Sequence, residues 1–309
     1  MKVLVTGGAG FIGSHVAETF LDAGAKVLVL DNLSTGREKN LPSGVEFEVA
    51  DIREEAFAAK VIAFRPDAIA HLAAQVDVRR SVSDPGLDAR INVMGTLGLL
   101  QAASQAGCRQ VVFSSTGGAI YGEQREFPAT EEHVCAPVSP YGTAKLCAEE
   151  YLKLFDRSGG PSCTLLRYAN VYGPRQDPHG EAGVVAIFAG QMLQGQATRI
   201  NGDGGQTRDF VYVSDVARAN RLAVEREILG KFNIGTGIES DINGLHRIMA
   251  RLLEIPNAPE YGPPAPGEQR RSSIDPAKAG RVMDWRPETD LETGLTRTLD
   301  YFKREIEHG

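Results

Sequence analysis

Tyr141 and Lys145 have the residue types and the spacing of a general base and its partner. They lie in the segment SPYGTAK (139–145), on a predicted helix that begins after Pro140. A spacing of four residues places both side chains on one helix face. An ammonium group near a phenol favours the phenolate, so we expect Lys145 to lower the pKa of Tyr141 below its usual value of about 10. Such a phenolate could remove the proton of a sugar or alcohol hydroxyl. The Y-x-x-x-K pattern alone also fits an exposed helix face, so a second motif has to support this chemistry.

Three glycines near the start of the chain supply that second motif. Gly7, Gly10 and Gly13 follow the apolar run KVLV and introduce a predicted helix. In this context Gly7 permits a turn, Gly10 lets a pyrophosphate approach the backbone, and Gly13 lets the helix pack against the strand. The free N–H groups and partial positive charge of the helix N-terminus favour phosphate. The pattern predicts a dinucleotide site, and a plain tight turn is the alternative.

Asp31 indicates which dinucleotide would bind. It ends the second apolar run, VLVLD, about twenty residues after the glycines, where an acidic residue can bind the adenosine ribose. A carboxylate there repels a 2′-phosphate, so NAD is favoured over NADP. Arg37 could weaken this preference, but it lies further along the loop. The alternative for Asp31 is a solvated turn residue.

The elements that must position these residues alternate between apolar runs and amphipathic segments. This alternation favours βαβ units, and solid apolar runs such as VLVL are typical of parallel strands buried on both faces. We therefore predict an α/β protein with a Rossmann-type doubly wound parallel sheet. The predicted strands are 2–5, 26–30, 45–49, 68–72, 110–114 and 163–168, and the predicted helices are 13–23, 56–64, 91–106 and 139–158.

After Val171 glycine and proline become frequent and the pattern loosens. The predicted strands in this region are 209–213 and 231–234, and the predicted helices are 181–194, 242–253 and 291–302. We predict a dinucleotide-binding domain over 1–170, to which some later segments return, and a smaller mixed α/β substrate region over 171–309.

Composition argues against several classes of function. The net charge of −7 disfavours a nucleic-acid partner, and no apolar run approaches the ~20 residues needed to cross a membrane. The N-terminal residues do not resemble a signal peptide. The six histidines are scattered, and the four cysteines have neither CxxC pairing nor zinc spacing. We therefore predict reduced thiols, a cytoplasmic location and no metal site.

With these motifs in view, the sequence resembles the extended short-chain dehydrogenase/reductase family, and within it the proteins similar to UDP-glucose 4-epimerases. The likeness runs nearly end to end and rests on TGGAGFIG (6–13), Asp31, HLAAQ (71–75), FSSTGGAIYG (113–122), SPYGTAK and RYANVYGPRQ (167–176). The resemblance implies NAD as cofactor, a C-terminal domain for a UDP-sugar, and a homodimer. The predicted helices 91–106 and 139–158 are the candidate dimer contacts.

The resemblance also implies roles for individual residues. Tyr141 matches the catalytic tyrosine, Lys145 its lysine, and Thr116 the third member, with Ser115 in reserve. Asn92 would support the cofactor, although a helix cap is as good an interpretation. The implied cofactor contacts are Gly7, Gly10, Phe11, Ile12, Gly13, Asp31, Asn32, Thr35, Gly36, Asp51, Ile52, Leu72, Ala73, Ala74, Gln75, Asn92, Ser114, Tyr141, Lys145 and Tyr168.

A second implied set concerns the substrate. Arg208 would hold the UDP diphosphate with its planar fork, and pairing with Asp209 is the alternative. Ser272 falls where a bulky residue would exclude an N-acetyl group, so its small size predicts that UDP-GlcNAc is accepted as well as UDP-glucose. The implied substrate contacts are Thr116, Tyr141, Asn170, Val184, Val185, Arg208, Glu268, Arg270 and Ser272.

The residues after Thr116 discriminate between reactions of this family. In the similar dehydratases and decarboxylases an acidic residue follows the catalytic threonine, whereas here Gly117 and Gly118 follow it. The resemblance therefore implies a simple 4-epimerisation of UDP-glucose and UDP-galactose through a transient 4-keto sugar. The alternatives are a UDP-uronate or pentose epimerase, a dehydratase or reductase, and an NAD-sensing regulator without activity. Such regulators often lack the Tyr/Lys pair, which is present here.

Overall fold

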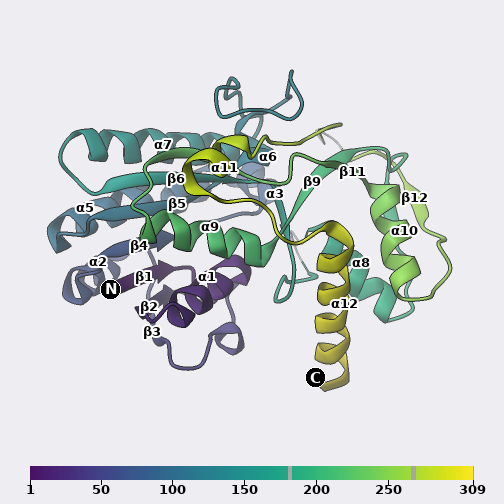
Figure 1. Cartoon of the computed structure of the whole chain (residues 1–309), viewed down its shortest axis with the longest axis horizontal. Coiled ribbons are helices and arrows are strands. Elements are labelled where there is room, and N and C mark those ends of the chain that lie inside the picture. Colours follow the sequence, from purple (N-terminus) through teal and green to yellow (C-terminus); the bar gives the residue numbers. More distant parts are fainter. Residues whose placement is uncertain (180–182, 266–268, 309) are drawn as a thin grey trace.

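The computed structural model describes residues 1–179, 183–265 and 269–308 of the chain. Seven parallel strands form its main sheet, in the order β10-β6-β5-β4-β1-β2-β3 (Figure 1). This order reverses direction between β1 and β4, so the carboxyl ends of these two strands border the crevice where such sheets bind ligands. The strands are β1 (Lys2–Thr6), β2 (Lys26–Asp31), β3 (Glu46–Val49), β4 (Ala68–His71), β5 (Gln110–Thr116), β6 (Ser162–Tyr168) and β10 (Gly230–Ile234).

Helices cover both faces of the main sheet, which confirms the predicted doubly wound fold. Two separate apolar cores result: α1 and α9 share one with residues 279–285, and α2, α5 and α7 share the other. Continuous burial on both faces explains why the central strands are solid apolar runs. The helices are α1 (Phe11–Asp22), α2 (Glu55–Phe64), α5 (Thr96–Ala106), α7 (Pro140–Arg157), α9 (Val213–Glu225) and α11 (Ala277–Met283).

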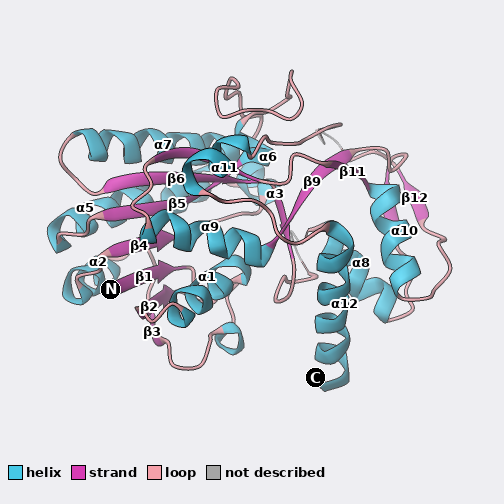
Figure 2. Cartoon of the chain, viewed as in Figure 1, coloured by secondary structure: helices cyan, strands magenta, loops and turns pink. Residues whose placement is uncertain are grey.

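A smaller lobe lies beside the carboxyl ends of the main strands (Figures 1 and 2). Its core forms where α8, α10 and α12 pack together and against β9. It contains a mixed sheet in the order β11-β9-β7 and the parallel pair β12-β8. The elements are β7 (Asn170–Tyr172), α8 (Val184–Leu193), β8 (Arg199–Asn201), β9 (Thr207–Tyr212), β11 (Glu239–Asp241), α10 (Ile242–Leu252), β12 (Glu260–Gly262) and α12 (Leu291–His308).

Short helices complete the crevice side of the main sheet. They are η1 (Glu38–Asn40), α3 (Val78–Ser83), α4 (Pro85–Ala89) and α6 (Gly117–Ile120). The predicted helix 91–106 is a π-helical turn, Arg90–Gly95, followed by α5. The predicted strand 209–213 ends at Tyr212, because Val213 already begins α9, which the sequence analysis did not predict. The start of the predicted helix 181–194 lies outside the described residues.

Candidate functional site

The turn between β1 and α1 is as close-packed as the glycine pattern predicts. Gly7 has a φ of +69°, and a Cβ there would lie 2.7 Å from the backbone nitrogen of Ala73. A Cβ on Gly13 would lie 2.1 Å from the carbonyl oxygen of Gly7. Gly10 precedes the helix in an extended conformation with no side-chain cap. The first turn of α1 therefore presents its N–H groups to the crevice, where a phosphate could accept them.

Asp31 holds the loop that follows β2. Its Oδ2 accepts from the backbone N–H of Ala9 at 3.0 Å, and its Oδ1 accepts from that of Leu33 at 2.8 Å. A Cβ on Gly36 would lie 2.9 Å from both carboxylate oxygens. The carboxylate is thus fixed at the end of β2, which rules out the alternative of a solvated turn residue, since it is 7% exposed.

Asn92 supports the site from behind rather than from its wall. Its Oδ1 accepts from the backbone N–H of Gln75 at 2.9 Å, and its Nδ2 donates to the Gln75 carbonyl at 2.9 Å. Asn92 lies within the π-helical turn Arg90–Gly95, so it does not cap a helix. These two bonds fix the segment after β4, which contains Leu72, Ala73 and Ala74.

Tyr141 and Lys145 lie in the first turns of α7, where Ser139 caps the helix through its hydroxyl. The Nζ of Lys145 is 6.0 Å from the centre of the Tyr141 ring and donates to the carbonyl of Ser114 at 2.9 Å. Thr116 ends β5 beside them, and its Oγ1 accepts from the N–H of Ala119 at 3.2 Å. Because Thr116 is the acceptor in that bond, its own hydroxyl hydrogen can serve a substrate oxygen.

Ser115 is placed differently from Thr116. Its hydroxyl donates to Glu149 Oε1 at 2.6 Å in the buried core, and Arg167 binds both oxygens of the same carboxylate. The Ser115 hydrogen is therefore committed to Glu149, which favours Thr116 over Ser115 as the third member.

The structure contradicts the predicted pKa of Tyr141. Burial, and to a smaller degree the carboxylate of Asp88, raise the pKa of Tyr141 above its usual value. Burial also lowers the pKa of Lys145 to about 8, against the opposing effects of Asp88 and Glu149. The ammonium is directed to Ser114 rather than to the phenol oxygen, so the expected lowering of the Tyr141 pKa is wrong.

These residues border one cavity of about 850 Å³ at the carboxyl ends of β1 and β4. Gly36 and Asn92 are the predicted cofactor contacts that do not line it. Gly36 packs closely against the Asp31 carboxylate, and Asn92 binds Gln75. The predicted residues on its wall are Gly7, Gly10, Phe11, Ile12, Gly13, Asp31, Asn32, Thr35, Asp51, Ile52, Leu72, Ala73, Ala74, Gln75, Ser114, Ser115, Thr116, Tyr141, Lys145, Tyr168 and Asn170.

Several predicted substrate contacts lie elsewhere. Val185 is buried in the core of the small lobe, and Ser272 is 4% exposed. Arg270 pairs with Asp203 at 2.6 Å on the surface, and Arg208 donates to the carbonyls of Thr207 and Gln269. None of these four lines the cavity as the described residues define it, nor does Val184. Glu268 lies outside the described residues.

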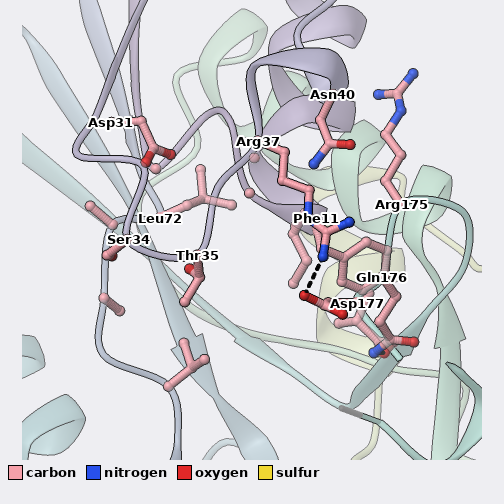
Figure 3. A pocket seen from close by; sticks show the side chains of 18 of the residues that line it. Phe11, Asp31, Ser34, Thr35, Arg37, Asn40, Leu72, Arg175, Gln176 and Asp177 are labelled. Atoms are coloured by element: carbon pink, nitrogen blue, oxygen red, sulfur yellow. Dashed lines mark hydrogen bonds and ion pairs between the residues drawn. The ribbon is translucent and has the colours of Figure 1, made fainter. Parts of the chain in front are cut away.

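The cavity also has a wall that the sequence analysis did not predict. Figure 3 shows Arg37, from the loop after Asp31, directed at Asp177 of the small lobe, and the two side chains form an ion pair of 2.9 Å. Arg37 is thereby held away from Asp31. The segment 175–179 and the α12 residues Tyr301, Phe302, Glu305 and Ile306 complete this wall. The basic residues that follow Asp31 in the sequence could have indicated that Arg37 lines the cavity. No local sequence pattern marks the α12 residues as part of the cavity wall.

Two further properties hold for the described residues. Among them, no group of three or more His, Cys, Asp or Glu side chains could hold a metal ion. No helix within the described ranges has the length and apolar character needed to cross a membrane.

The chain is similar in sequence and in structure to known proteins. Residues 3–235 match the model of the NAD dependent epimerase/dehydratase family. The UDP-glucose 4-epimerase of Mycolicibacterium smegmatis is 44% identical over 99% of both chains. The structure of the Thermotoga maritima UDP-glucose 4-epimerase with UDP-glucose is 46% identical, with a TM-score of 0.96 over 99% of this chain and 100% of that one. The Thermus thermophilus UDP-glucose 4-epimerase in complex with NAD is 46% identical, with a TM-score of 0.92 over 98% of this chain and 99% of that one.

Proposed function

This chain belongs to the NAD dependent epimerase/dehydratase family, and from that premise we propose that it is an NAD-dependent 4-epimerase that interconverts UDP-glucose and UDP-galactose. The observation that carries the proposal is that Thr116, Tyr141 and Lys145 share one cavity wall with the glycine-rich turn. The similarity to epimerases solved with UDP-glucose and with NAD supports the same substrate and cofactor.

The residues divide the work of binding and chemistry. The turn at Gly7–Gly13, Asp31 and the segment after β4 would hold NAD. When bound, NAD would supply a hydride acceptor with a positively charged ring in its oxidised form and, in its reduced form, the donor that returns the hydride. Tyr141 would accept the proton of the sugar 4-hydroxyl, with Thr116 sharing the hydrogen bond, and return it to the product. Lys145 would keep its positive charge beside the phenol, because burial raises the pKa of Tyr141 and a phenolate there needs a nearby cation.

The start of α6 favours epimerisation over loss of water or carbon dioxide. Gly117 and Gly118 follow Thr116 and form the first turn of this helix. No carboxylate stands at that place to perform the additional proton transfer. We propose that residues 1–170 bind NAD and 171–309 the UDP-sugar, with Arg208 and Arg270 toward the nucleotide-sugar side. We also propose that UDP-GlcNAc is accepted, which rests on the family resemblance at Ser272 alone, since Ser272 is 4% exposed and does not line the cavity.

The decisive experiment incubates the purified protein with UDP-glucose, without added NAD, and follows UDP-galactose by chromatography. We expect conversion at a constant total sugar pool. Tyr141→Phe should lower turnover by about 10²- to 10⁴-fold while the bound NAD content stays unchanged. Tyr151→Phe, on the same helix but away from the cavity, is the matched control and should keep its activity. Wild-type rates in Tyr141→Phe would show that another group is the base.

We further propose a homodimer that works in the cytoplasm. The π-helical turn, α3 and α7 pack together and carry exposed apolar side chains, which include Val82, Met94 and Leu154. The four cysteines are free thiols, which fits a reducing compartment. Met94→Glu should convert the dimer to a monomer in sedimentation velocity. Ile238→Glu, an equally exposed apolar position in the small lobe, should remain dimeric; a dimeric Met94→Glu would count against this interface.

A further inference from the structure

Asp88 is a buried carboxyl group that the proposed chemistry does not yet use. It lies on α4 and is 1% exposed. Its Oδ1 accepts from Gln75 Nε2 and from Asn92 Nδ2, each at 3.0 Å. Its Oδ2 is fully buried and has no hydrogen-bond partner among the described residues. A buried carboxylate oxygen without a donor is costly, so its charge needs compensation from nearby.

The elements packed around α4 provide only one buried cation. α4 contacts α3, the π-helical turn and α7. Arg79 and Arg80 of α3 and Arg90 of the π-helical turn are exposed, whereas Lys145 of α7 is 3% exposed. The titratable and charged groups on these elements that act on Asp88, or that Asp88 acts on, are Lys145 and Tyr141.

The other carboxylate near Lys145 is already neutralised. Glu149 also acts on Lys145, but Arg167 binds both of its oxygens, at 2.9 and 2.6 Å, and Ser115 donates to it as well. Asp88 has only the neutral amide donors of Gln75 and Asn92. Asp88 is therefore the carboxylate that remains to balance the positive charge of the Lys145 ammonium.

We propose that Asp88 is a positioning residue for the proposed epimerisation: its Oδ1 fixes the Gln75 segment of the cavity wall, and the charge of the carboxylate is the counter-ion of Lys145. This inference rests on the proposed function for its role in turnover. Through Asp88, α4 would help to determine the pKa values of Tyr141 and Lys145, although Asp88 itself does not line the cavity.

The sign of the expected effect follows from the charge. A carboxylate disfavours the phenolate of Tyr141 and favours the ammonium of Lys145, so it raises the pKa of both groups. Removing the charge lowers both pKa values, and the pair titrates as a coupled unit. Both limbs of the pH profile of kcat/KM should therefore move toward lower pH, whichever group determines which limb.

Asp88→Asn separates charge from hydrogen bonding. The asparagine oxygen can accept both bonds from Gln75 and Asn92, and its amide replaces the oxygen that has no partner. We expect both limbs to move by about 1 pH unit toward lower pH. Asp88→Glu should keep the limbs of the pH profile at their wild-type positions, because it keeps the carboxylate charge. Asp84→Asn removes an exposed carboxylate that caps the same helix. Both limbs of the pH profile of this variant should stay at their wild-type positions.

A measurement without turnover separates this inference from the proposed function. NMR of protein labelled with ¹⁵N-lysine gives the pKa of the Lys145 Nζ directly. It should be lower in Asp88→Asn than in the wild type, whether or not the protein epimerises UDP-glucose. If the wild type has no epimerase activity but the Lys145 pKa falls in Asp88→Asn, the proposed reaction fails and the counter-ion assignment stands. An unchanged Lys145 pKa, or superimposable limbs in an active enzyme, overturns the assignment.

That assignment can also be checked on the wild type alone. In protein labelled with ¹³C at the aspartate carboxyl groups, Asp88 should be ionised at neutral pH, although burial raises its pKa. A protonated Asp88 at neutral pH has no charge to offer and would overturn the proposal, even if Asp88→Asn failed to fold.

Discussion

At the scale of single residues, Gly13 has the least space for a side chain around the cavity. Its missing Cβ would lie 2.1 Å from the Gly7 carbonyl oxygen and 2.8 Å from the Gly7 carbonyl carbon. Both neighbours are backbone atoms, so they cannot move aside without displacing the turn between β1 and α1. The absence of one methyl group therefore determines how closely the helix N-terminus approaches the crevice.

Gly13→Ala should consequently damage both stability and cofactor retention. We expect a loss of about 1–3 kcal/mol in the free energy of unfolding, as for overpacked cores, together with loss of bound dinucleotide. Urea denaturation and the absorbance of nucleotide released by acid check these two results. Gly280→Ala, on α11 with its Cβ 3.6 Å from the Trp285 carbonyl oxygen, should instead stabilise the protein by about 0.5–1 kcal/mol. A Gly13→Ala protein that retains its full dinucleotide content would refute this account of the turn.

At the scale of elements, one buried ion pair joins α7 to β6. Glu149 is 0% and Arg167 2% exposed, and the two form a bidentate pair that Tyr121 and Ser115 extend by hydrogen bonds. The pair lies one helical turn beyond Lys145, so it fixes the helix that carries the catalytic pair onto the sheet. Breaking it leaves an uncompensated charge in the core, which costs far more than losing a surface pair.

Glu149→Gln should destabilise the protein by about 3–5 kcal/mol, because the guanidinium of Arg167 is left buried without a counter-charge. The double variant Glu149→Met/Arg167→Met should recover part of that loss, since neither charge remains. Thermal and urea unfolding of the single and double variants give the comparison. Glu292→Gln breaks the exposed pair between Arg251 and Glu292 and should cost less than about 1 kcal/mol. Equal effects of Glu149→Gln and Glu292→Gln would contradict the argument from burial.

The elements that the sequence predicts well are those with a strong local signal. The six predicted strands of residues 2–168 and the strand at 231–234 all occur within two residues of their predicted ends. In the central strands the signal is strong because burial on both faces requires continuous apolar runs, whereas the edge strand β3 is largely exposed. The helix α9 was missed although apolar side chains recur along one face, since alanines make up much of that face and the prediction stopped at the preceding strand. The strands β7, β8, β11 and β12 have three residues each, too few for a periodic pattern.

At the scale of the whole molecule, two ion pairs connect the main sheet to the small lobe across the cavity. Arg37 pairs with Asp177, and Lys39 of η1 pairs with Glu305 of α12. All four side chains line the cavity and are 41–57% exposed. Sequence reasoning could not predict these pairs or the α12 wall, because their partners lie 140 and 266 residues apart and only the packing of the lobes brings them together.

Removing both pairs should speed the release of bound cofactor without destroying the fold. Exposed pairs contribute about 0.2–1 kcal/mol each, so Asp177→Asn/Glu305→Gln should release NAD about 2- to 30-fold faster at low ionic strength. The difference should nearly vanish in about 1 M salt, where screening extends over only a few ångströms. Exchange of bound NAD for radiolabelled NAD measures the rate. Glu46→Gln, which breaks the exposed pair with Lys26 away from the cavity, should have no effect; equal release rates in the double variant and the wild type would exclude this role.

The place of α12 in the cavity wall has a consequence for how the protein is made in the cell. The wall begins at Gly7 and is completed by Ile306, and these residues leave the ribosome roughly 15–60 s apart at ordinary rates of synthesis. The nascent glycine-rich turn is therefore made long before the α12 residues that face it across the cavity. The first βαβ units therefore have to fold on their own sheet contacts, and the complete cavity wall forms only after synthesis of the last helix.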